Sequence, residues 1–453
     1  MRILFGIILG IILFVLFRSG YKRQRDLFSP LCFFALFQFV RYVPIMIFNS
    51  DDVFFITLTD KTLLPTFCFE MLFIFSVFLG YSFFKKRNNK LNNDFASRKK
   101  TITQYIDVPL SVILIVFLIG FASRLYIIFN SGGILYVLRN MGNAYKSLSS
   151  DSNGYILAIG NLMTLSILML IYKIAFSKKK KVLIVILLIM IALGMLSFLV
   201  YSSRSPALEM LVVVIFGYHY LIKRIKVGSF FKPKALLIIL LAATIIVLLP
   251  VLRKMSSGYS SLDYQNLELD IDVFDSIGSV FEELSTVKID TYVYNHFNSS
   301  NYWYGANFLN LFVAWIPSSI FRNKPCLDDG VYLCNLLYGY NFSPNTGRND
   351  LIETYSWPFT TPSCMYACFG FIGILIGGII LGIIYRKTYK LTMKKTNPFT
   401  VFLYFLIIYQ LEFSTLSISQ TLIPMVVCGV SYYYCIKRTG TATYRLGLQK
   451  SPE

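Results

Sequence analysis

Long apolar runs alternate with short polar segments along most of this 453-residue chain. A helix needs about 20 apolar residues to cross the hydrocarbon core of a bilayer. Because runs of that length recur, the pattern predicts an all-α polytopic membrane protein with about 11 transmembrane helices, in a range of about 10 to 12. The predicted spans lie near residues 2–18, 28–48, 64–84, 106–129, 155–176, 182–201, 206–222, 235–252, 360–385, 398–415 and 420–436.

One polar segment interrupts this pattern. Residues 253–357 are rich in acidic and aromatic side chains and lie between two groups of apolar runs. We therefore predict a transmembrane bundle in 1–252 with about eight spans, a large extramembrane loop with short helices in 253–357, and a second bundle in 358–453 with about three spans and a basic tail. Inside the loop, the apolar run 306–321 is too short to span and favours an interfacial or re-entrant helix.

The charge pattern orients these predicted spans. Cytoplasmic loops of membrane proteins carry an excess of Lys and Arg. Here every second loop is basic, whereas the alternate loops, including the large one, are acidic or mixed. The pattern therefore predicts an N-terminus outside, a C-terminus inside and the large loop outside. The basic segments are 18–25, 85–100, 178–181, 223–234, 386–395 and 437–445.

The net charge of +20 does not indicate a nucleic-acid partner, because the cations are divided among separate short loops instead of one soluble face. The chain has two histidines, His219 and His296, and no Cys/His spacing typical of zinc, so we expect neither a metal centre nor a cofactor. Cys326 and Cys334 both lie in the outer loop. Their spacing leaves open whether they form a disulfide in an oxidising compartment.

Several charged residues lie inside predicted spans, where charges are rare and are candidates for function. For each of them the alternative is snorkelling to an interface or a structural pair within the bundle. Neither reading is favoured for Arg41, Glu70 and Glu412, which lie mid-span without a motif. Arg124 and Arg204 lie toward the outer ends of their spans, against the usual charge bias. The set is Arg41, Glu70, Arg124, Arg204, Glu209 and Glu412.

Further cations border the outer loop, namely Arg253, Arg322 and Lys324. With Arg124 and Arg204 they predict an anion at the depth of the lipid headgroups, for which the planar fork of arginine suits phosphate. A lipid-linked phosphate or diphosphate fits this pattern, and plain anionic phospholipid is the alternative. The loop's many Tyr and Trp residues, interspersed with Asn, Asp and Ser, suit a sugar-binding surface; interfacial aromatic belts are the alternative.

Three segments resemble the O-antigen polymerase (Wzy) family, also described as oligosaccharide repeat unit polymerases. They are Ser-Arg-Ser-Pro at 203–206, WIPSSIFRNKP at 315–325 and TTPSCMYACFGFIGILIGG at 360–378, in that order and with the large loop before the last. Two features depart from the family: residues 364–368 replace a stretch that often holds an acid and small residues, and an Arg-x10-Gly pattern is absent from both long outer loops.

The resemblance implies a multi-pass protein of the bacterial inner membrane. It implies a glycosyltransferase that joins undecaprenyl-diphosphate-linked oligosaccharides at the periplasmic face, among membrane lipid, with a chain-length regulator of the polysaccharide pathway as a partner. An O-antigen ligase-like glycosyltransferase remains open as an alternative. A flippase for the lipid-linked sugar is less favoured, because the sequence shows no internal repeat.

Such a reaction needs cations to stabilise the leaving diphosphate. Arg204 is the first candidate, and the cations named above (Arg124, Arg253, Arg322 and Lys324) are the others. A base that deprotonates the acceptor hydroxyl would assist the reaction. The candidates for this base are His296, Glu353 and Asp329. No metal is required, since arginines can supply the positive charge.

Overall fold

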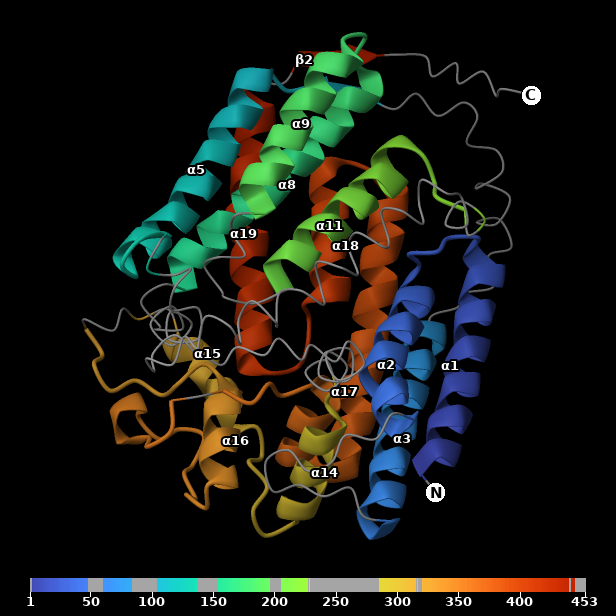
Figure 1. Ribbon diagram of the computed structural model, residues 1–453, viewed down its shortest axis with the longest axis vertical. Helices are drawn as coiled ribbons and strands as arrows, with labels where there is room; N and C mark the ends of the chain where they lie inside the picture. The colour runs from blue at the N-terminus through green and yellow to red at the C-terminus, as the bar shows by residue number, and fades with distance from the viewer. Residues whose placement is uncertain are drawn as a thin grey trace, which may run out of the picture.

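The protein is a bundle of long helices in a computed structural model (Figure 1). The structure describes residues 2–47, 60–83, 104–134, 136, 154–195, 205–226, 228, 285–314, 316, 320–354, 356–439 and 441–444. The long helices are α1 (Arg2–Gln24), α2 (Pro30–Ile47), α3 (Asp60–Phe83), α5 (Leu110–Asn130), α8 (Gly154–Phe176), α9 (Lys180–Met195), α11 (Ser205–Gly217), α17 (Thr361–Lys394), α18 (Pro398–Tyr409) and α19 (Thr415–Thr439).

The predicted spans coincide with these helices, except span 235–252, which lies outside the described residues. Six helices in the described part of the chain are long and apolar enough to cross a membrane. Helix α2, the segment Glu209–Ile222 and α18 are apolar but shorter. The protein is therefore a multi-pass membrane protein, and the total of about 11 spans stays a prediction.

The helices pack into two hydrophobic cores. In the first core, α1, α2, α3 and most of α17 pack with two short helices, α14 (Val287–His296) and α16 (Asp329–Leu337). In the second core, α5, α8, α9, α11 and α18 pack together. Helix α17 joins the two cores, since Ile374 and Leu381 belong to the first, whereas Tyr389 and Met393 belong to the second.

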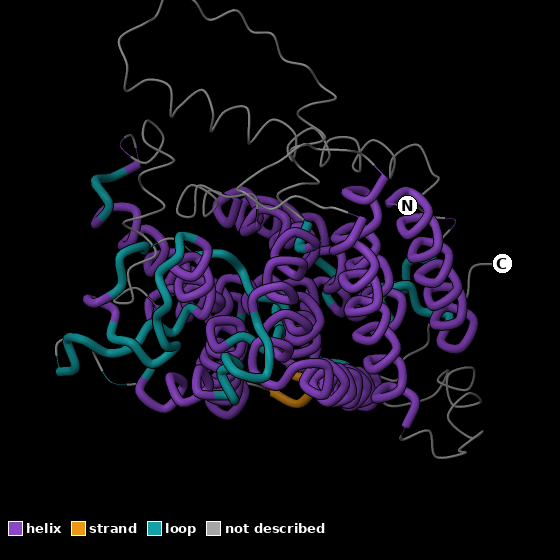
Figure 2. Tube along the Cα trace, turned by 90° about the horizontal axis from the view of Figure 1, so that it is seen from below, coloured by secondary structure: helices purple, strands orange, loops and turns teal. Residues whose placement is uncertain are grey.

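Polar segments and short helices from residues 285–357 lie at one end of the bundle (Figure 1). Seen from that end, the described loops run across the ends of the helices (Figure 2). Besides α14 and α16, this region holds a 3-10 helix at Ala306–Leu309 followed by α15 (Asn310–Val313), and a 3-10 turn at Arg348–Asp350. Within the predicted helix 306–321, the described residues Ala306–Val313 are helical.

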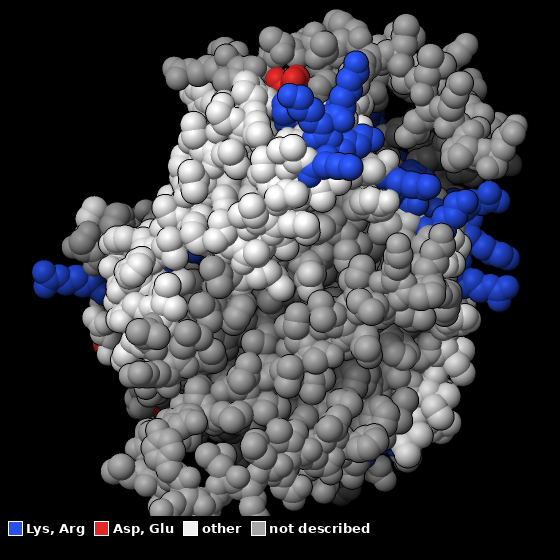
Figure 3. All heavy atoms as spheres, turned by 45° about the horizontal axis from the view of Figure 1, so that its top comes forward, with Lys and Arg blue, Asp and Glu red and all other residues white. Residues whose placement is uncertain are grey.

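Basic side chains gather at the opposite end of the bundle (Figure 3). Lys22 and Arg23 lie in the last turn of α1, and Lys394 ends α17. Two four-residue strands lie at this end, β1 (Gln104–Asp107) and β2 (Thr441–Tyr444), paired antiparallel. Apart from this small strand pair, the elements of the described residues are helices, which confirms the predicted all-α class.

The helices at the basic end are tied together by a buried carboxylate in the turn between α1 and α2. Asp26 accepts hydrogen bonds from the hydroxyls of Tyr389 (2.8 Å) and Tyr220 (3.1 Å). His219 Nε2 lies 2.9 Å from Asp26 Oδ1, off the line of a hydrogen bond, so that interaction is electrostatic. Burial alone would raise the pKa of Asp26, but His219, Tyr389 and Arg224 together outweigh it and the pKa is lowered. Asp26 therefore stays ionised and holds α17 and the π-helical turn after α11 (Tyr218–Ile222) to this turn.

Candidate functional site

Helix α17 begins beside the polar region with a fully capped N-terminus. Thr360 is the N-cap, with extended backbone, and its Oγ1 accepts from the Ser363 N–H, while the Thr360 N–H donates to Ser363 Oγ at 3.1 Å. This reciprocal capping box satisfies two N–H groups that a helix start would leave unpaired. Pro362 lies in the first turn, where its missing N–H is harmless. The Thr-Pro-Ser motif therefore fixes where α17 starts.

Helix α17 is broken after two turns. Phe369 and Gly370 leave the helical conformation, and Gly370 has φ +62° and ψ −149°, a combination open essentially only to glycine. The N–H groups of Trp303 and Tyr304 donate to the carbonyls of the two residues before the break, at 2.8 and 3.1 Å. A Cβ at position 370 would lie 2.7 Å from the Tyr302 hydroxyl oxygen. The predicted single span 360–385 is therefore two helical pieces clamped by a loop.

An ion pair lies at the start of α17 and links α2 to the connector after α18. Arg41 Nη1 on α2 lies 2.7 Å from Glu412 Oε1, and the two side chains are 17% and 19% exposed. Glu412 Oε2 accepts from the Thr361 N–H at 2.8 Å and from its hydroxyl. The Arg41 guanidinium also lies 4.1 Å above the Phe37 ring. Glu412 falls within the predicted span 398–415, but α18 ends at Tyr409, so Glu412 lies in the connector that follows this helix. Arg41 and Glu412 thus pair with each other, which is the structural alternative named for them above.

Asp290 on α14 is a second carboxyl group at this junction, and it is fully buried. It accepts from the hydroxyls of Tyr42 (3.1 Å) and Thr360 (3.2 Å), which ties α14 to α2 and α17. Burial raises its pKa. Glu70 is equally buried, and its two oxygens have no hydrogen-bond donor among the described residues, although Asp290 is its electrostatic neighbour. Two neighbouring buried carboxyl groups can coexist when one proton is shared between them, because only one of them then carries a negative charge.

Asp329, one of the predicted bases, is fully buried in α16. Its carboxylate accepts from the Thr415 N–H (2.8 Å), the Thr415 hydroxyl (2.7 Å) and the Asn307 amide (3.2 Å). A carboxylate at the first N–H of a helix stabilises that helix. Burial raises the pKa of Asp329 to about 6. The structure therefore gives Asp329 an anchoring role at the start of α19.

The other two predicted bases are less enclosed. His296 ends α14, where its ring stacks on Tyr292 with ring centroids 5.5 Å apart. It is half-buried, and burial lowers its pKa, which keeps the imidazole neutral and able to accept a proton. Glu353 is also half-buried. The side-chain amide of Asn335 on α16 forms hydrogen bonds with the backbone N–H and C=O of Glu353, each 2.9 Å long. All three candidates thus belong to the polar region beside the first core.

The predicted cations do not form one cluster. Arg124 is on α5 in the second core, 8% exposed, and a Cβ at Gly160 on α8 would lie 2.1 Å from its Nε. Glu209 on α11 is its electrostatic neighbour. Arg204, which directly precedes α11, and Arg253 lie outside the described residues.

Arg322 and Lys324 lie apart from Arg124, on the loop that follows α15. Arg322 is exposed. Lys324 is 8% exposed, and its ammonium donates to the Ile316 carbonyl at 3.3 Å. The two segments that bear cations therefore belong to different parts of the fold.

Cys326 and Cys334 are both buried thiols, not joined to each other by a disulfide. In the described part of the chain, no group of three His, Cys, Asp or Glu side chains is placed to hold a metal ion.

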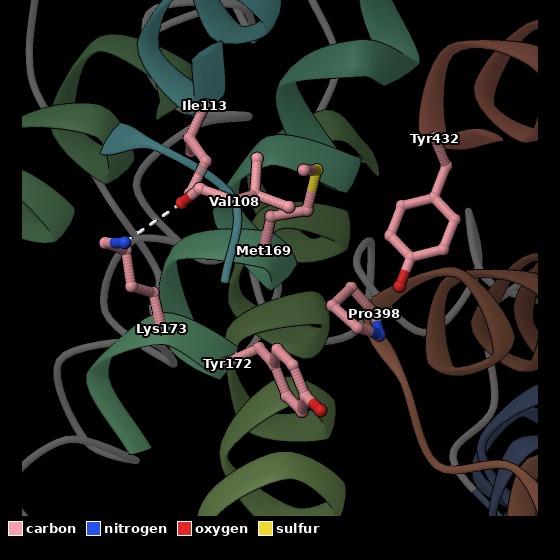
Figure 4. Close-up of a pocket in the computed structure, with 7 residues that line it drawn as sticks. All are labelled: Val108, Ile113, Met169, Tyr172, Lys173, Pro398 and Tyr432. Carbon is pink, nitrogen blue, oxygen red and sulfur yellow. Dashed lines mark hydrogen bonds between the residues drawn. The ribbon is translucent and has the colours of Figure 1, made fainter. Parts of the chain in front are cut away.

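A small hollow lies at the basic end, away from the polar region (Figure 4). Val108, Met169 and Tyr172 are among the residues that line it. Lys173 at its edge donates to the Val108 carbonyl at 2.9 Å and pairs with Asp107 at 2.5 Å. Its wall is mostly apolar and its one charged group is already paired, so it does not suit an oligosaccharide.

Sequence reasoning missed the junction around Asp290, Tyr42 and Thr360. Asp290 is one of many acids in the polar loop, and nothing in the local sequence marks it as buried. The sequence did mark Arg41 and Glu412, because they are charged residues within apolar runs. It also marked the Thr-Pro-Ser motif, which opens α17, and Glu412 accepts a hydrogen bond from the first turn of that helix.

The sequence profile of the family described as O-antigen polysaccharide polymerase Wzy matches residues 1–438, nearly the whole chain. Searches of curated proteins and of solved structures return no match.

Proposed function

The chain belongs to the O-antigen polysaccharide polymerase Wzy family, and we propose that it joins oligosaccharide repeat units carried on undecaprenyl diphosphate at the periplasmic face of the bacterial inner membrane. The observation that carries this proposal is the extent of the match, which includes the membrane helices, the polar region and the start of α17. A glycosyltransferase-type polymerase of polysaccharide biosynthesis is the activity of that family. The lipid carrier and the membrane face are the parts that we add.

The proposed reaction transfers a growing glycan. The hydroxyl oxygen of an incoming repeat unit forms a bond to the anomeric carbon of the growing chain. The bond between that carbon and the phosphate oxygen breaks, so undecaprenyl diphosphate leaves with the electron pair. The hydroxyl proton passes to a base. The protein must therefore stabilise developing negative charge on the diphosphate and accept one proton.

We assign the donor's diphosphate to Arg124, which is on α5 in the second core, and to Arg204. Arg124 is nearly buried, and a cation in a low-dielectric site interacts with an anion more strongly than one in water. Arg204 directly precedes α11, whose N-terminal end favours negative charge. Arg253 would contribute from the membrane edge of the large loop, whereas Arg322 and Lys324 lie on a separate segment and are considered below.

Among the candidate bases, the structure favours His296 for proton transfer. It is half-buried and neutral near pH 7, because burial lowers its pKa. Activity should therefore fall only when the pH drops below about 6.5, the ordinary pKa of a histidine side chain. A His296→Gln variant should lose this acidic limb of the pH–rate profile and most of its rate. Glu353 is the next candidate, and Asp329 ranks behind both since its carboxylate is enclosed.

We place the basic end in the cytoplasm, following the positive-inside rule. Residues 253–357 then form the periplasmic part between bundles 1–252 and 358–453, with a periplasmic N-terminus and a cytoplasmic C-terminus. A reporter fused near Ser299 that is active only in the cytoplasm would overturn this orientation. A chain-length regulator as a partner is proposed on family grounds alone.

Deletion of the gene tests the function. Surface polysaccharide is then separated on a gel and compared with that of the parent strain. Single repeats on lipid A core identify a polymerase. Bare core with long chains retained on the lipid carrier identifies a ligase, and loss of periplasmic repeat units identifies a flippase. Arg204→Ala should also stop polymerisation while the protein still inserts; a normal ladder of chain lengths would remove Arg204 from the mechanism.

A further inference from the structure

The proposed reaction brings together two substrates that each carry a lipid diphosphate. The donor loses its diphosphate, whereas the acceptor keeps its own throughout the step. Both headgroups must be held at once, and they repel each other if they share a cluster of cations. The chemistry therefore requires two separate anion sites, and this inference rests on the proposed function above.

One segment of the polar region offers a second site, the loop tip formed by residues 309–324. Lys324 is 8% exposed, and the Ile316 carbonyl is its hydrogen-bond acceptor. No carboxylate lies within ion-pair distance of Lys324 among the described residues. Removing an ammonium from water is costly unless an anion meets it. A nearly buried lysine without a counter-charge thus points to an anionic ligand.

Two arginines lie near this lysine, Arg322 along the chain and Arg348 across an isolated β-bridge. Arg322 is exposed two residues before it. The Arg348 N–H donates to the Lys324 carbonyl at 3.2 Å, beside a bridge between Pro325 and Gly347. Asp350, the acid nearest to these cations along the chain, is exposed and accepts from the Asn323 amide at 2.8 Å. Arg322, Lys324 and Arg348 therefore bring three cations to this segment, which suits a diphosphate.

The same tip presents apolar side chains to its surroundings. Phe312 is 78% exposed, Ile320 77% and Leu309 58%. Three large apolar groups on a polar loop are unfavourable in water, at about 25 cal/mol for each Å² left exposed. Apolar groups beside cations match a ligand that joins hydrocarbon to phosphate, as a polyprenyl diphosphate does.

The tip lies at the depth where such a headgroup would be found. Helix α15 contacts α19, and Asn307 just before it shares Asp329 with Thr415, the first residue of α19. In Figure 1, α15 lies level with the end of α18 and the start of α19. Since α19 is one of the candidate membrane spans, its first residue marks the membrane boundary.

The two sets of cations differ in ways that suit the two substrates. Arg124 is buried in the second core, where it can stabilise charge that develops on a leaving group. The loop tip adjoins the first core through Cys326, and there the nearly buried Lys324 has the exposed Arg322 beside it in the chain. An exposed cation such as Arg322 favours capture of an anion from solution or the membrane surface.

We propose that Lys324, with Arg322 and Arg348, binds the diphosphate of the acceptor substrate, and that Leu309, Phe312 and Ile320 receive its polyprenyl chain. The ligand chemistry is an anionic lipid headgroup. Two lipids carry it: the lipid-linked acceptor, which the proposal names, and ordinary anionic phospholipid.

Two-substrate kinetics with the purified full-length protein in nanodiscs test this assignment. The donor is a lipid-linked repeat blocked at its acceptor hydroxyl. The acceptor is a lipid-linked repeat whose anomeric oxygen is replaced by carbon, so that it cannot transfer. Lys324→Met should raise the KM for the acceptor about tenfold or more, as loss of a charge-assisted contact does. The kcat and the KM for the donor should not change.

Phe312→Asp should raise the same KM through the lipid chain. Arg18→Met, an exposed arginine at the basic end of α1, serves as the matched control and should change nothing. An unchanged acceptor KM in Lys324→Met overturns the inference, and so does a change confined to kcat or to the donor. If the wild type couples no sugars, the proposed function fails instead.

A binding measurement separates the two sources of the headgroup. Fluorescent polyprenyl diphosphate is titrated into nanodiscs that contain phosphatidylglycerol, with wild type and Lys324→Met. Saturable binding that the variant weakens supports the acceptor site. Binding that phosphatidylglycerol abolishes, or that the variant leaves unchanged, overturns it in favour of an ordinary phospholipid contact.

Discussion

The ion pair between Arg41 and Glu412 should govern how firmly α2, the start of α17 and the connector after α18 hold together. Glu412→Gln keeps the shape of the side chain but removes its charge. It leaves the guanidinium, which is 17% exposed, without its counter-ion, and it weakens the acceptor for two Thr361 donors. Breaking one partner of a buried pair costs about 3 kcal/mol or somewhat more.

Arg41→Met should cost less, about 2 kcal/mol, because the Thr361 donors still serve the carboxylate. The double variant Arg41→Met/Glu412→Gln should not cost the sum of the two. It removes both charges and leaves an apolar side chain beside an amide, so it should cost only about 2–3 kcal/mol. We expect a coupling free energy of about 2–3 kcal/mol.

Denaturant titration of the four proteins in detergent micelles gives the free energies of unfolding for this cycle. The pair Lys173–Asp107 at the basic end is the matched control. Its carboxylate is 42% exposed, so its coupling should be under about 1 kcal/mol. Additive losses at Arg41 and Glu412, with the double variant the least stable, would refute the bridging role.

Three further outcomes follow from the described contacts. Burial raises the Asp329 pKa to about 6, so its contribution to stability is full below about pH 4 and is lost as pH rises through about 6. Between about pH 4 and pH 6 the unfolding free energy of the wild type should therefore fall by roughly 3 kcal/mol more than that of Asp329→Asn. Equal pH dependences for the two proteins would contradict this. Gly370→Ala should destabilise the protein by about 1–3 kcal/mol or more, whereas Gly10→Ala, whose Cβ would meet nothing closer than 3.7 Å, should be neutral; equal thermal midpoints would count against the clamped break. Gly160→Ala should displace the guanidinium of Arg124 and shorten the glycan ladder with normal expression, and a full ladder would separate Arg124 from catalysis.

Hydropathy predicted where the helices lie because a membrane span depends mainly on its own composition. It predicted their ends less well. Helix α17 continues to Lys394, beyond the predicted end at 385, since polar residues outside the bilayer can extend the same helix. The break at Gly370 was not predicted, although the run of Phe and Gly residues there carried the signal.

The candidate site was harder to predict because its parts are distant in sequence. Arg41 and Glu412 are 371 residues apart, and Asp290 reaches Tyr42 across 248. No local pattern records which charged residues meet. The same limit applies to Asp329, whose acidic neighbourhood suggested a base, whereas its enclosure by Thr415 and Asn307 is a tertiary property.

The central claim is that this protein alone polymerises lipid-linked repeat units. The direct measurement supplies the purified protein in nanodiscs with one undecaprenyl-diphosphate-linked repeat unit and resolves the products by length. We expect a ladder of glycans and one undecaprenyl diphosphate released for each linkage formed. Correctly folded protein that yields only single repeats, with no released undecaprenyl diphosphate, would contradict the claim.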